Sequence, residues 1–481
     1  MPPILSHRIS FAVLAATMAF SVYACCLLGI YMLASVGIGL PFRELMALVC
    51  SGAVLVIAYK FRPALASACE HMTGVSHLWQ TAVLLGIALR LGLWLLTGQE
   101  VQVNDGLHYF TLANRLYLGQ SYELDGYAFW PPGIPLIYSL FMHLVGQVSW
   151  IAVPVNCAFF LLAAVSIRSL CRRLGLHQGA AGLTVGLLAV WPALVFPITQ
   201  ISKETVLIGL LPAILALLVS RSLWTSVPAG LLTGAAILTQ PSLMLVPVLL
   251  ATTLYTRRLP LRMLVARMAL LFVGILIVVS PWSYRNYLVF GEFVPVSTNA
   301  GLVLHAGNQP EMVKSLGEVG GFLQPPMPST PMKHDLALSR WHKDEALRFI
   351  SSNKMDFAKL VWNRLVITMG DDSDSAYRSL RLTRKVPGNV YLLTKAVSNL
   401  FWLMLTAMLA ASCYAASKES AKQGPCSLAV FAAGATLYLM AVHGLAEGGA
   451  RHHMAWSWLY ALLLVAGLVR SAAPTDGHRR A

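Results

Sequence analysis

Two side chains at the ends of apolar runs are the best candidates for chemistry in this sequence. Asp105, in the stretch "VQVNDGLHYF", follows a run that ends near residue 97, and Arg285, in "SPWSYRNYLVFGEF", ends another run. A carboxylate beside hydrocarbon is desolvated, which makes it a better proton acceptor than it is in water. A guanidinium matches phosphate oxygens with its planar fork. Together, such groups could take a proton from a hydroxyl and stabilise a departing phosphate.

Both residues also have a purely structural interpretation. Asn104 or Asp105 can cap a short helix of about 106–118, because asparagine and aspartate are among the commonest helix caps. Arg285 can extend to the membrane interface among neighbouring aromatic residues, as part of an aromatic belt. The residue types alone leave both interpretations open.

Three further polar groups carry weaker signals. Arg90 lies in the middle of "TAVLLGIALRLGLWLL", where a charge costs about 2.5–3.5 kcal/mol, so it is expected to face protein or water. The acidic turn "GDDSDSAYR" (370–378) has carboxylates spaced as in cation sites, but a solvated turn is favoured because no other ligands are near in sequence. His452 and His453 are adjacent and would diverge by about 100° on a helix, which disfavours a joint metal site.

Most of the chain consists of apolar runs long enough to cross a bilayer. Hydrophobic residues make up 57% of the 481 residues and charged ones 11%. Since lipid satisfies no backbone hydrogen bonds, these runs must be helices, and their lack of alternation excludes a lipid-facing barrel. The net charge of +15 lies mostly between the runs, where it orients spans and does not indicate nucleic-acid binding. About twelve spans are predicted, near residues 9–37, 44–59, 79–97, 150–168, 180–200, 205–220, 226–239, 242–256, 266–283, 396–414, 427–443 and 454–470.

These spans divide the chain into four parts. Residues 1–78 form an N-terminal transmembrane hairpin, 79–283 a transmembrane core that includes a first polar segment (98–149), 284–395 a late polar segment, and 396–481 the last spans and a short tail. Basic residues gather in the loops that lie on the same side of the membrane as the N-terminus. Both termini are therefore expected in the cytoplasm, and both polar segments outside. No internal repeat is evident, which weighs against a transporter built from inverted halves. The eight cysteines show no disulfide or zinc pattern.

Four stretches of the sequence resemble one group of membrane enzymes. They are "NDGLHYFTLANRLYLGQSYELDGYAFWPPGIPL", "GAAILTQPSLMLVP", "PWSYRNYLVFGEFVPVSTNAGLVLHAGNQP" and "EALRFISSNKMDFAKLVWNRL". Over roughly residues 80–365 the chain is similar to the bacterial GT-C glycosyltransferases, in particular the dolichyl-phosphate-mannose protein mannosyltransferases and the lipid A aminoarabinose transferases. The resemblance implies an all-α bundle of about twelve transmembrane helices with interfacial helices in the first polar segment. Residues 1–78 would be an addition before the usual start of the family.

The resemblance also implies a reaction and roles for individual residues. The reaction is transfer of a hexosyl or pentosyl group from a polyprenyl-phosphate donor to a glycan, lipid or protein acceptor at the outer face of the bacterial inner membrane. Asp105 matches the acidic residue of the family, the general base, and Arg285 the basic residue near the carrier phosphate. Where relatives have a second acid, this chain has Gly106, and no metal or other cofactor is predicted. The resemblance further implies that Lys203 and Arg451 bind the donor phosphate, and that four other residues bind substrate: His108, Tyr109, Glu204 and His453.

Two other functions remain as alternatives at this point. A transporter or flippase of a lipid-linked glycan would need a polar path across the bilayer, and within the presumed spans Arg90 is the clearly ionisable central residue. A non-catalytic factor for envelope polysaccharide assembly would tolerate replacement of both Asp105 and Arg285. Membrane lipids are expected partners in each case, and nucleic acid in none.

Overall fold

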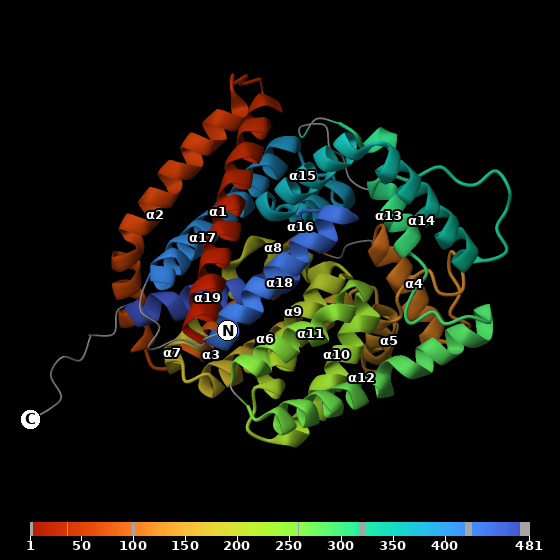
Figure 1. The fold of residues 1–481 in the computed structure, drawn as a ribbon, viewed down its shortest axis with the longest axis horizontal. Helices are drawn as coiled ribbons and strands as arrows, with labels where there is room; N and C mark the ends of the chain where they lie inside the picture. Colours follow the sequence, from red (N-terminus) through yellow and green to blue (C-terminus); the bar gives the residue numbers. More distant parts are fainter. Residues whose placement is uncertain are drawn as a thin grey trace, which may run out of the picture.

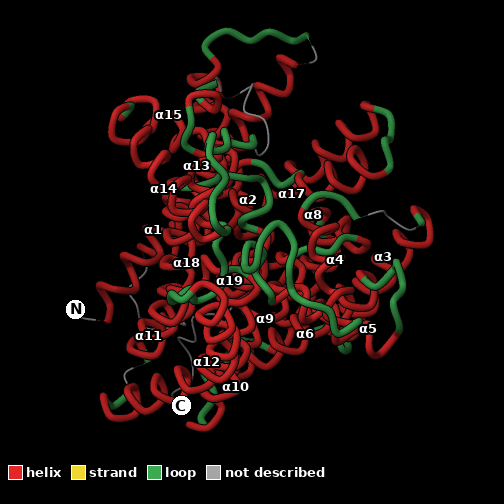
Figure 2. The backbone as a smooth tube through the Cα atoms, turned by 90° about the vertical axis from the view of Figure 1, so that its right-hand side faces the viewer, coloured by secondary structure: helices red, strands yellow, loops and turns green. Residues whose placement is uncertain are grey.

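The computed structural model describes residues 3–35, 37–98, 102–257, 259–314, 316, 323–418 and 426–471. Within these residues all regular secondary structure is helical, and no strand is present (Figure 1 and Figure 2). The predicted all-α class is therefore confirmed. The predicted tail beyond residue 471 lies outside the described residues.

In the described part of the chain, seven helices are long and apolar enough to cross a membrane. They are α1 (Pro3–Ser35), α2 (Arg43–Thr73), α3 (Leu78–Thr97), α6 (Ala152–Arg173), α12 (Leu261–Phe290), α17 (Gly388–Lys418) and α18 (Cys426–Leu445). An eighth candidate consists of α7 (Gln178–Val190) followed by α8 (Pro192–Val195) and η1 (Phe196–Thr199), bent by 76°. The bend falls at Trp191, which is extended, as is usual for a residue before proline.

The remaining predicted runs form shorter apolar helices. These are α9 (Lys203–Leu218), α10 (Ser226–Thr239), α11 (Val246–Thr256) and α19 (Ser457–Ser471), with 3-10 turns at η2 (Leu223–Thr225), η3 (Pro241–Leu245) and η7 (Met454–Trp456). Each of the predicted runs thus overlaps one or more helices of the described chain. The number of twelve crossings stays a prediction.

Helix α9 lies inside the bundle and is buried along almost its whole length. It packs against α6 and α10, and α10 packs in turn against α12. The crossing of α10 and α12 requires glycine, since a Cβ on Gly230 would lie 2.1 Å from the Leu271 carbonyl oxygen. Small residues at such a crossing let two membrane helices approach closely. Helices α2 and α3 are mostly exposed and apolar, as expected for lipid-facing spans.

Two short helices form in the first polar segment, as predicted. They are α4 (Asp105–Tyr117) and α5 (Gly133–Val145), separated by a turn that contains consecutive prolines at 131 and 132. Helix α5 lies tightly against α10, because a Cβ on Gly133 would be 2.4 Å from the Thr239 nitrogen. The first polar segment is therefore fixed to the transmembrane core.

The late polar segment is also helical and is joined to the first one. It contains α13 (Ala300–Gly307), η4 (Pro310–Met312), α14 (Asp335–Ser352), α15 (Lys354–Gly370), α16 (Asp374–Ala376) and the π-helical turn η6 (Tyr377–Thr383). Asp335 Oδ2 accepts hydrogen bonds from the Ala128 backbone nitrogen (3.0 Å) and from Thr298 Oγ1 (2.8 Å). Residues far apart in sequence thereby meet beside α4.

Candidate functional site

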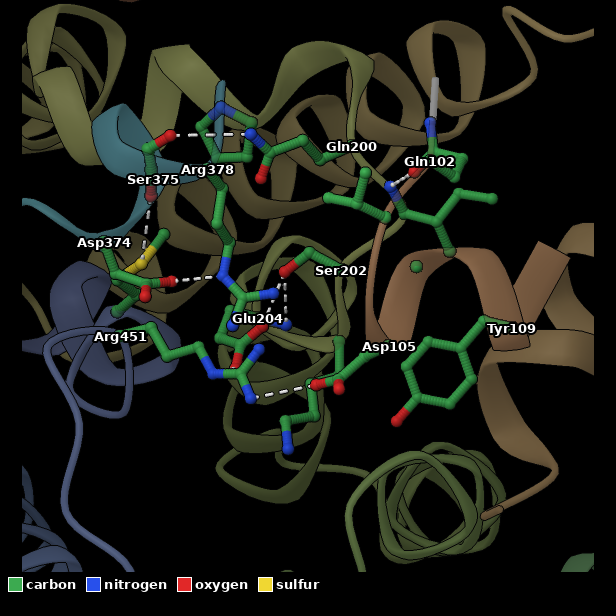
Figure 3. Close-up of a pocket in the computed structure, with 16 residues that line it drawn as sticks. Gln102, Asp105, Tyr109, Gln200, Ser202, Glu204, Asp374, Ser375, Arg378 and Arg451 are labelled. Atoms are coloured by element: carbon green, nitrogen blue, oxygen red, sulfur yellow. Dashed lines mark hydrogen bonds and ion pairs between the residues drawn. The ribbon is translucent and has the colours of Figure 1, made fainter. Parts of the chain in front are cut away.

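A charged cavity forms where α4, the start of α9, α16 and the turn before η7 meet (Figure 3). It encloses about 550 Å³ of space not filled by protein atoms, including the part open to solvent. We call it the charged pocket. The residues that line it are Gln102, Val103, Asp105, Gly106, Tyr109, Pro197, Gln200, Ile201, Ser202, Lys203, Glu204, Asp374, Ser375, Arg378, Arg451 and Met454.

One guanidinium in this pocket serves two carboxylates. Arg451 Nη2 lies 2.9 Å from Asp105 Oδ2, and Arg451 Nε lies 3.6 Å from Glu204 Oε1. The Asp105 side chain is 30% exposed and the Glu204 side chain 3%. Glu204 Oε2 accepts a further hydrogen bond from Ser202 Oγ at 2.5 Å. The first and last parts of the chain therefore meet through an ion pair that remains accessible from the cavity.

The charges of the described lining residues balance. Asp105, Glu204 and Asp374 are opposed by Lys203, Arg378 and Arg451, and Arg378 Nε lies 2.7 Å from Asp374 Oδ2. Lys203 is half-buried, and no hydrogen bond or ion pair joins its amine to another described residue. An ammonium group without a partner at the wall of a cavity is well placed to bind an anion.

Local sequence explains how the start of α9 reaches the pocket. Ser202 caps this helix by accepting a hydrogen bond from the Glu204 nitrogen at 3.2 Å, which places Lys203 and Glu204 in its first turn. Gln102 joins α4 to the same segment, because its Oε1 accepts from the Ile201 nitrogen at 2.9 Å. A Cβ on Gly106 would lie 3.0 Å from that Oε1 atom. Glycine at this position therefore permits the close approach without displacing the Gln102 amide.

Charge–charge interactions control the protonation of the ion pair. Burial alone would raise the pKa of Asp105, but the charges of Arg451, Lys203 and Arg378 outweigh it and hold that pKa well below its ordinary value. Burial would lower the pKa of Arg451, whereas Glu204 and Asp105 raise it well above the ordinary value. Asp105 is therefore ionised but is a weak base.

Three other residues predicted to bind substrate have different positions. Tyr109 is buried, lines the pocket and packs edge-on against Trp130 at 5.5 Å between ring centroids. Burial raises the pKa of its phenol, which is thus neutral. His108 does not line the pocket and faces Asp125 at 3.3 Å. His453 is fully buried and also lies outside the lining.

Arg285 lies outside the charged pocket. Its Nη1 donates to the Tyr127 carbonyl oxygen at 2.5 Å, and its Nη2 donates to the Tyr122 carbonyl oxygen at 3.1 Å. Its guanidinium also stacks over the Trp282 ring, 4.9 Å from the centroid. The guanidinium that meets Asp105 is that of Arg451, and Arg285 instead holds the turn between α4 and α5.

Replacing Arg285 with alanine is expected to loosen this turn. The loss of the two hydrogen bonds that a charged donor makes to this turn should lower stability by about 1–3 kcal/mol, measured as a lower unfolding temperature in detergent. The affinity for a polyprenyl phosphate, the carrier that the sequence resemblance implies, should change little. Arg340→Ala is the control, since it removes an exposed pair with Glu292 that contributes less than about 1 kcal/mol. A large loss of affinity in Arg285→Ala would instead show that Arg285 binds the carrier phosphate, as the resemblance implies.

The acidic turn is buried, so the prediction of a solvated turn is wrong. Asp372 is 1% exposed, and each carboxylate has a basic partner. Asp371 pairs with Lys395 at 3.3 Å, Asp374 pairs with Arg378, and Asp372 lies 2.9 Å from His453 Nε2. Within the described residues no group of three or more candidate ligands could hold a metal ion.

Sequence reasoning missed Arg378 as a pocket residue. Its spacing of four from Asp374, which suits a pair on one helix face, was the available signal. Arg90 is buried and donates to the Gly86, Leu188 and Leu194 carbonyl oxygens at 3.0, 3.4 and 3.0 Å. It faces protein, one of the two environments predicted for it.

Comparisons with known proteins give matches in structure alone. No family model matches the chain, and no curated protein matches its sequence. Among solved structures, the chain is similar to ArnT from Cupriavidus metallidurans bound to undecaprenyl phosphate, with 18% identity over 83% of this chain and 79% of that one and a TM-score of 0.38. The apo state of the same protein gives 18% identity, 81% and 77% coverage and the same TM-score. A similarity of this level places no residue of the charged pocket.

Proposed function

We propose that this protein is an integral membrane glycosyltransferase. It would move a sugar from a polyprenyl-phosphate donor to a glycan, lipid or protein acceptor at the outer face of the bacterial inner membrane, with both termini in the cytoplasm. The observation that carries the proposal is the charged pocket, in which Asp105 meets Arg451 while Lys203 has no partner among the described residues. Sugar transfer from a phosphate needs such a base and such cations.

Lys203 is the cation available to the donor before reaction. A phosphodiester donor carries one negative charge, and Lys203 can neutralise it without breaking any ion pair within the described pocket. Arg378 and Arg451 are already paired with carboxylates. The donor phosphate is therefore expected to lie against the first turn of α9, where the helix N-terminus adds a favourable dipole.

Asp105 is the base for the acceptor hydroxyl. The hydroxyl proton passes to Asp105 while the acceptor oxygen bonds to the anomeric carbon, and the bond from that carbon to the phosphate oxygen breaks. The electron pair leaves with the phosphate, and such a direct displacement inverts the anomeric configuration. The leaving phosphate monoester then carries a charge of about −1.5 to −2 at neutral pH.

Arg451 connects these two changes of charge. When Asp105 takes the proton, it loses the charge that attracts Arg451, and in the same step the phosphate gains negative charge. The guanidinium can then turn toward the phosphate while Glu204, 3.6 Å from its Nε, remains as its second partner. A cation that meets developing charge in this way stabilises the transition state more than the bound donor.

The structure weakens the main argument for a flippase. Arg90 is bonded to backbone carbonyl oxygens and lies over the Phe160 ring, 4.1 Å from the centroid. Its charge is therefore accommodated by protein contacts, and its presence in a span no longer indicates a polar path.

Binding of undecaprenyl phosphate to Lys203→Met tests the proposed donor site. We expect the affinity to fall by about 10- to 100-fold, because a hydrogen bond to a charged group contributes about 1.5–3 kcal/mol. Lys343→Met, which changes an exposed lysine on α14, should bind as the wild type does. Equal affinity of the wild type and Lys203→Met would show that the phosphate does not lie against Lys203.

A further inference from the structure

A buried aspartate–histidine pair lies directly behind the charged pocket. His453 is 0% exposed and Asp372 is 1% exposed, and His453 Nε2 lies 2.9 Å from Asp372 Oδ1. Neither residue lines the pocket. The His453 ring stacks on Trp402 with centroids 4.3 Å apart. A buried polar pair of this kind is costly unless its hydrogen bonds are satisfied.

The hydrogen bonds of the pair fix its protons. His453 Nδ1 lies 2.9 Å from the Thr368 carbonyl oxygen, which can only accept, so Nδ1 carries a hydrogen. His453 Nε2 faces a carboxylate oxygen, so one proton must lie between the two groups. Asp372 Oδ2 accepts from Trp191 Nε1 at 2.7 Å. The pair therefore holds one shared proton and has no net charge, whichever partner carries it.

The pair connects segments that form three walls of the pocket. Trp191 lies at the bend between α7 and α8, which leads through η1 to the start of α9. Asp372 precedes Asp374 by two residues, and its backbone nitrogen donates to Asn399 Oδ1 on α17 at 2.8 Å. His453 follows Arg451 by two residues. The three segments thus meet at the Asp372 carboxylate, and each of them reaches the pocket only a few residues away from that meeting point.

Arg451 is held from both sides by the end of α15. His453, two residues after it, donates to the Thr368 carbonyl oxygen, and the nitrogen of Gly449, two residues before it, donates to Thr368 Oγ1 at 3.2 Å. A turn anchored at both ends leaves little freedom to the residue in its middle.

We propose that Asp372 and His453 are positioning residues, which hold the turn of Arg451 against the acidic turn so that the guanidinium reaches both Asp105 and the leaving carrier phosphate. The inference rests on the proposed function, because it gives the pair a role in phosphate binding. It differs from the substrate contact expected of His453 from the sequence, since a side chain with no exposed surface touches no substrate.

Asparagine should be able to take the place of Asp372 without loss of the local geometry. In Asp372→Asn the amide nitrogen can donate to Nε2 of a neutral His453, and the amide oxygen can accept from Trp191. The geometry then survives without the shared proton. In His453→Gln one amide nitrogen cannot easily serve both Thr368 and Asp372, so the turn that carries Arg451 is released.

Affinity for undecaprenyl phosphate, measured beside the unfolding temperature, tests this inference. We expect His453→Gln to bind about 10-fold more weakly, as is usual when a residue that orients a ligating group is lost, and Asp372→Asn to stay within about 3-fold. Arg267→Gln is the control for lost stability. Arg267 is buried and bonds to three carbonyl oxygens at the other end of α9 (Leu218, Ser220 and Arg221), so its loss should lower the unfolding temperature and leave the affinity unchanged.

The outcomes separate the pair from the pocket itself. If His453→Gln and Arg267→Gln lose affinity only in proportion to their loss of stability, the pair is merely structural and the inference is overturned. The same holds if Arg451→Gln weakens binding and His453→Gln does not. If neither Lys203→Met nor Arg451→Gln weakens binding, the proposed function fails instead. A second signature supports positioning: the acid limb of the rate profile should move to higher pH in His453→Gln, as in Arg451→Gln.

Discussion

Asp105→Asn is expected to abolish sugar transfer while the donor still binds. An amide cannot accept the proton of the acceptor hydroxyl, and loss of a positioned base costs about 10²- to 10⁴-fold in rate. The fold should survive, because the amide oxygen can still accept a hydrogen bond from Arg451, and Glu204 remains as a counterion 3.6 Å from the guanidinium. In the proposed site the donor phosphate lies against Lys203, which the substitution leaves in place.

The measurement is turnover of a radiolabelled polyprenyl-phosphate sugar by the purified protein in detergent, with undecaprenyl phosphate binding determined on the same samples. Asp356→Asn is the matched control, since it makes the same change in an exposed pair with Lys359 on α15. Full turnover by Asp105→Asn would show that Asp105 is not the general base. Loss of both turnover and binding would show that Asp105 holds the pocket together and does not act in the chemical step.

The position of Asp105 could be predicted because it depends on local sequence. The residue follows an apolar run, precedes an amphipathic stretch and begins α4, whose bounds lie within a residue of those expected. Hydrophobic patterning alone is enough for such a prediction. Local sequence likewise explains the start of α5, where consecutive prolines stand directly before its first residue, Gly133.

The partner of Asp105 could not be predicted from patterning. Arg285 and Arg451 both lie near the end of an apolar helix, and the resemblance assigned both to the donor phosphate, whereas the aromatic residues around Arg285 favoured its structural interpretation. The choice depends on which helix ends meet in space. Arg451 reaches the pocket because its turn is anchored to α15, a contact between residues more than eighty positions apart.

Burial of the acidic turn was missed for a similar reason. Three aspartates in nine residues are typical of a solvated loop, because charged side chains are rarely buried without partners. Here the partners come from other elements: Lys395 from α17 and His453 from the turn before η7. No local sequence pattern around the acidic turn predicts these partners.

Arg451→Gln should change both the rate and its dependence on pH. Without the guanidinium, one cation no longer stabilises the negative charge that develops on the leaving phosphate. The loss of one such donor lowers the rate by about 10²- to 10³-fold. In addition, Arg451 is the largest of the influences that hold the pKa of Asp105 down. Its removal leaves burial to raise that pKa, so Asp105 becomes protonated at a higher pH than in the wild type.

The sign of the pH effect follows from the direction of the shift. In the wild type the pKa of Asp105 in the folded protein is depressed below the unfolded value of about 3.9, so the ion pair contributes stability above that value and loses it as pH falls through the folded pKa. The acid limb of kcat/KM reports the free enzyme and should therefore lie at low pH in the wild type. In Arg451→Gln it should move upward, toward neutrality.

Rate profiles of the wild type, Arg451→Gln and Arg451→Lys over the acid range check this expectation. Arg451→Lys keeps the positive charge and loses the fork, so its acid limb should stay close to that of the wild type while its rate falls. An unchanged acid limb in Arg451→Gln would mean that Arg451 does not control the ionisation of Asp105. The transfer of Arg451 from the carboxylate to the phosphate would then have no basis, because the two charges would be independent of each other.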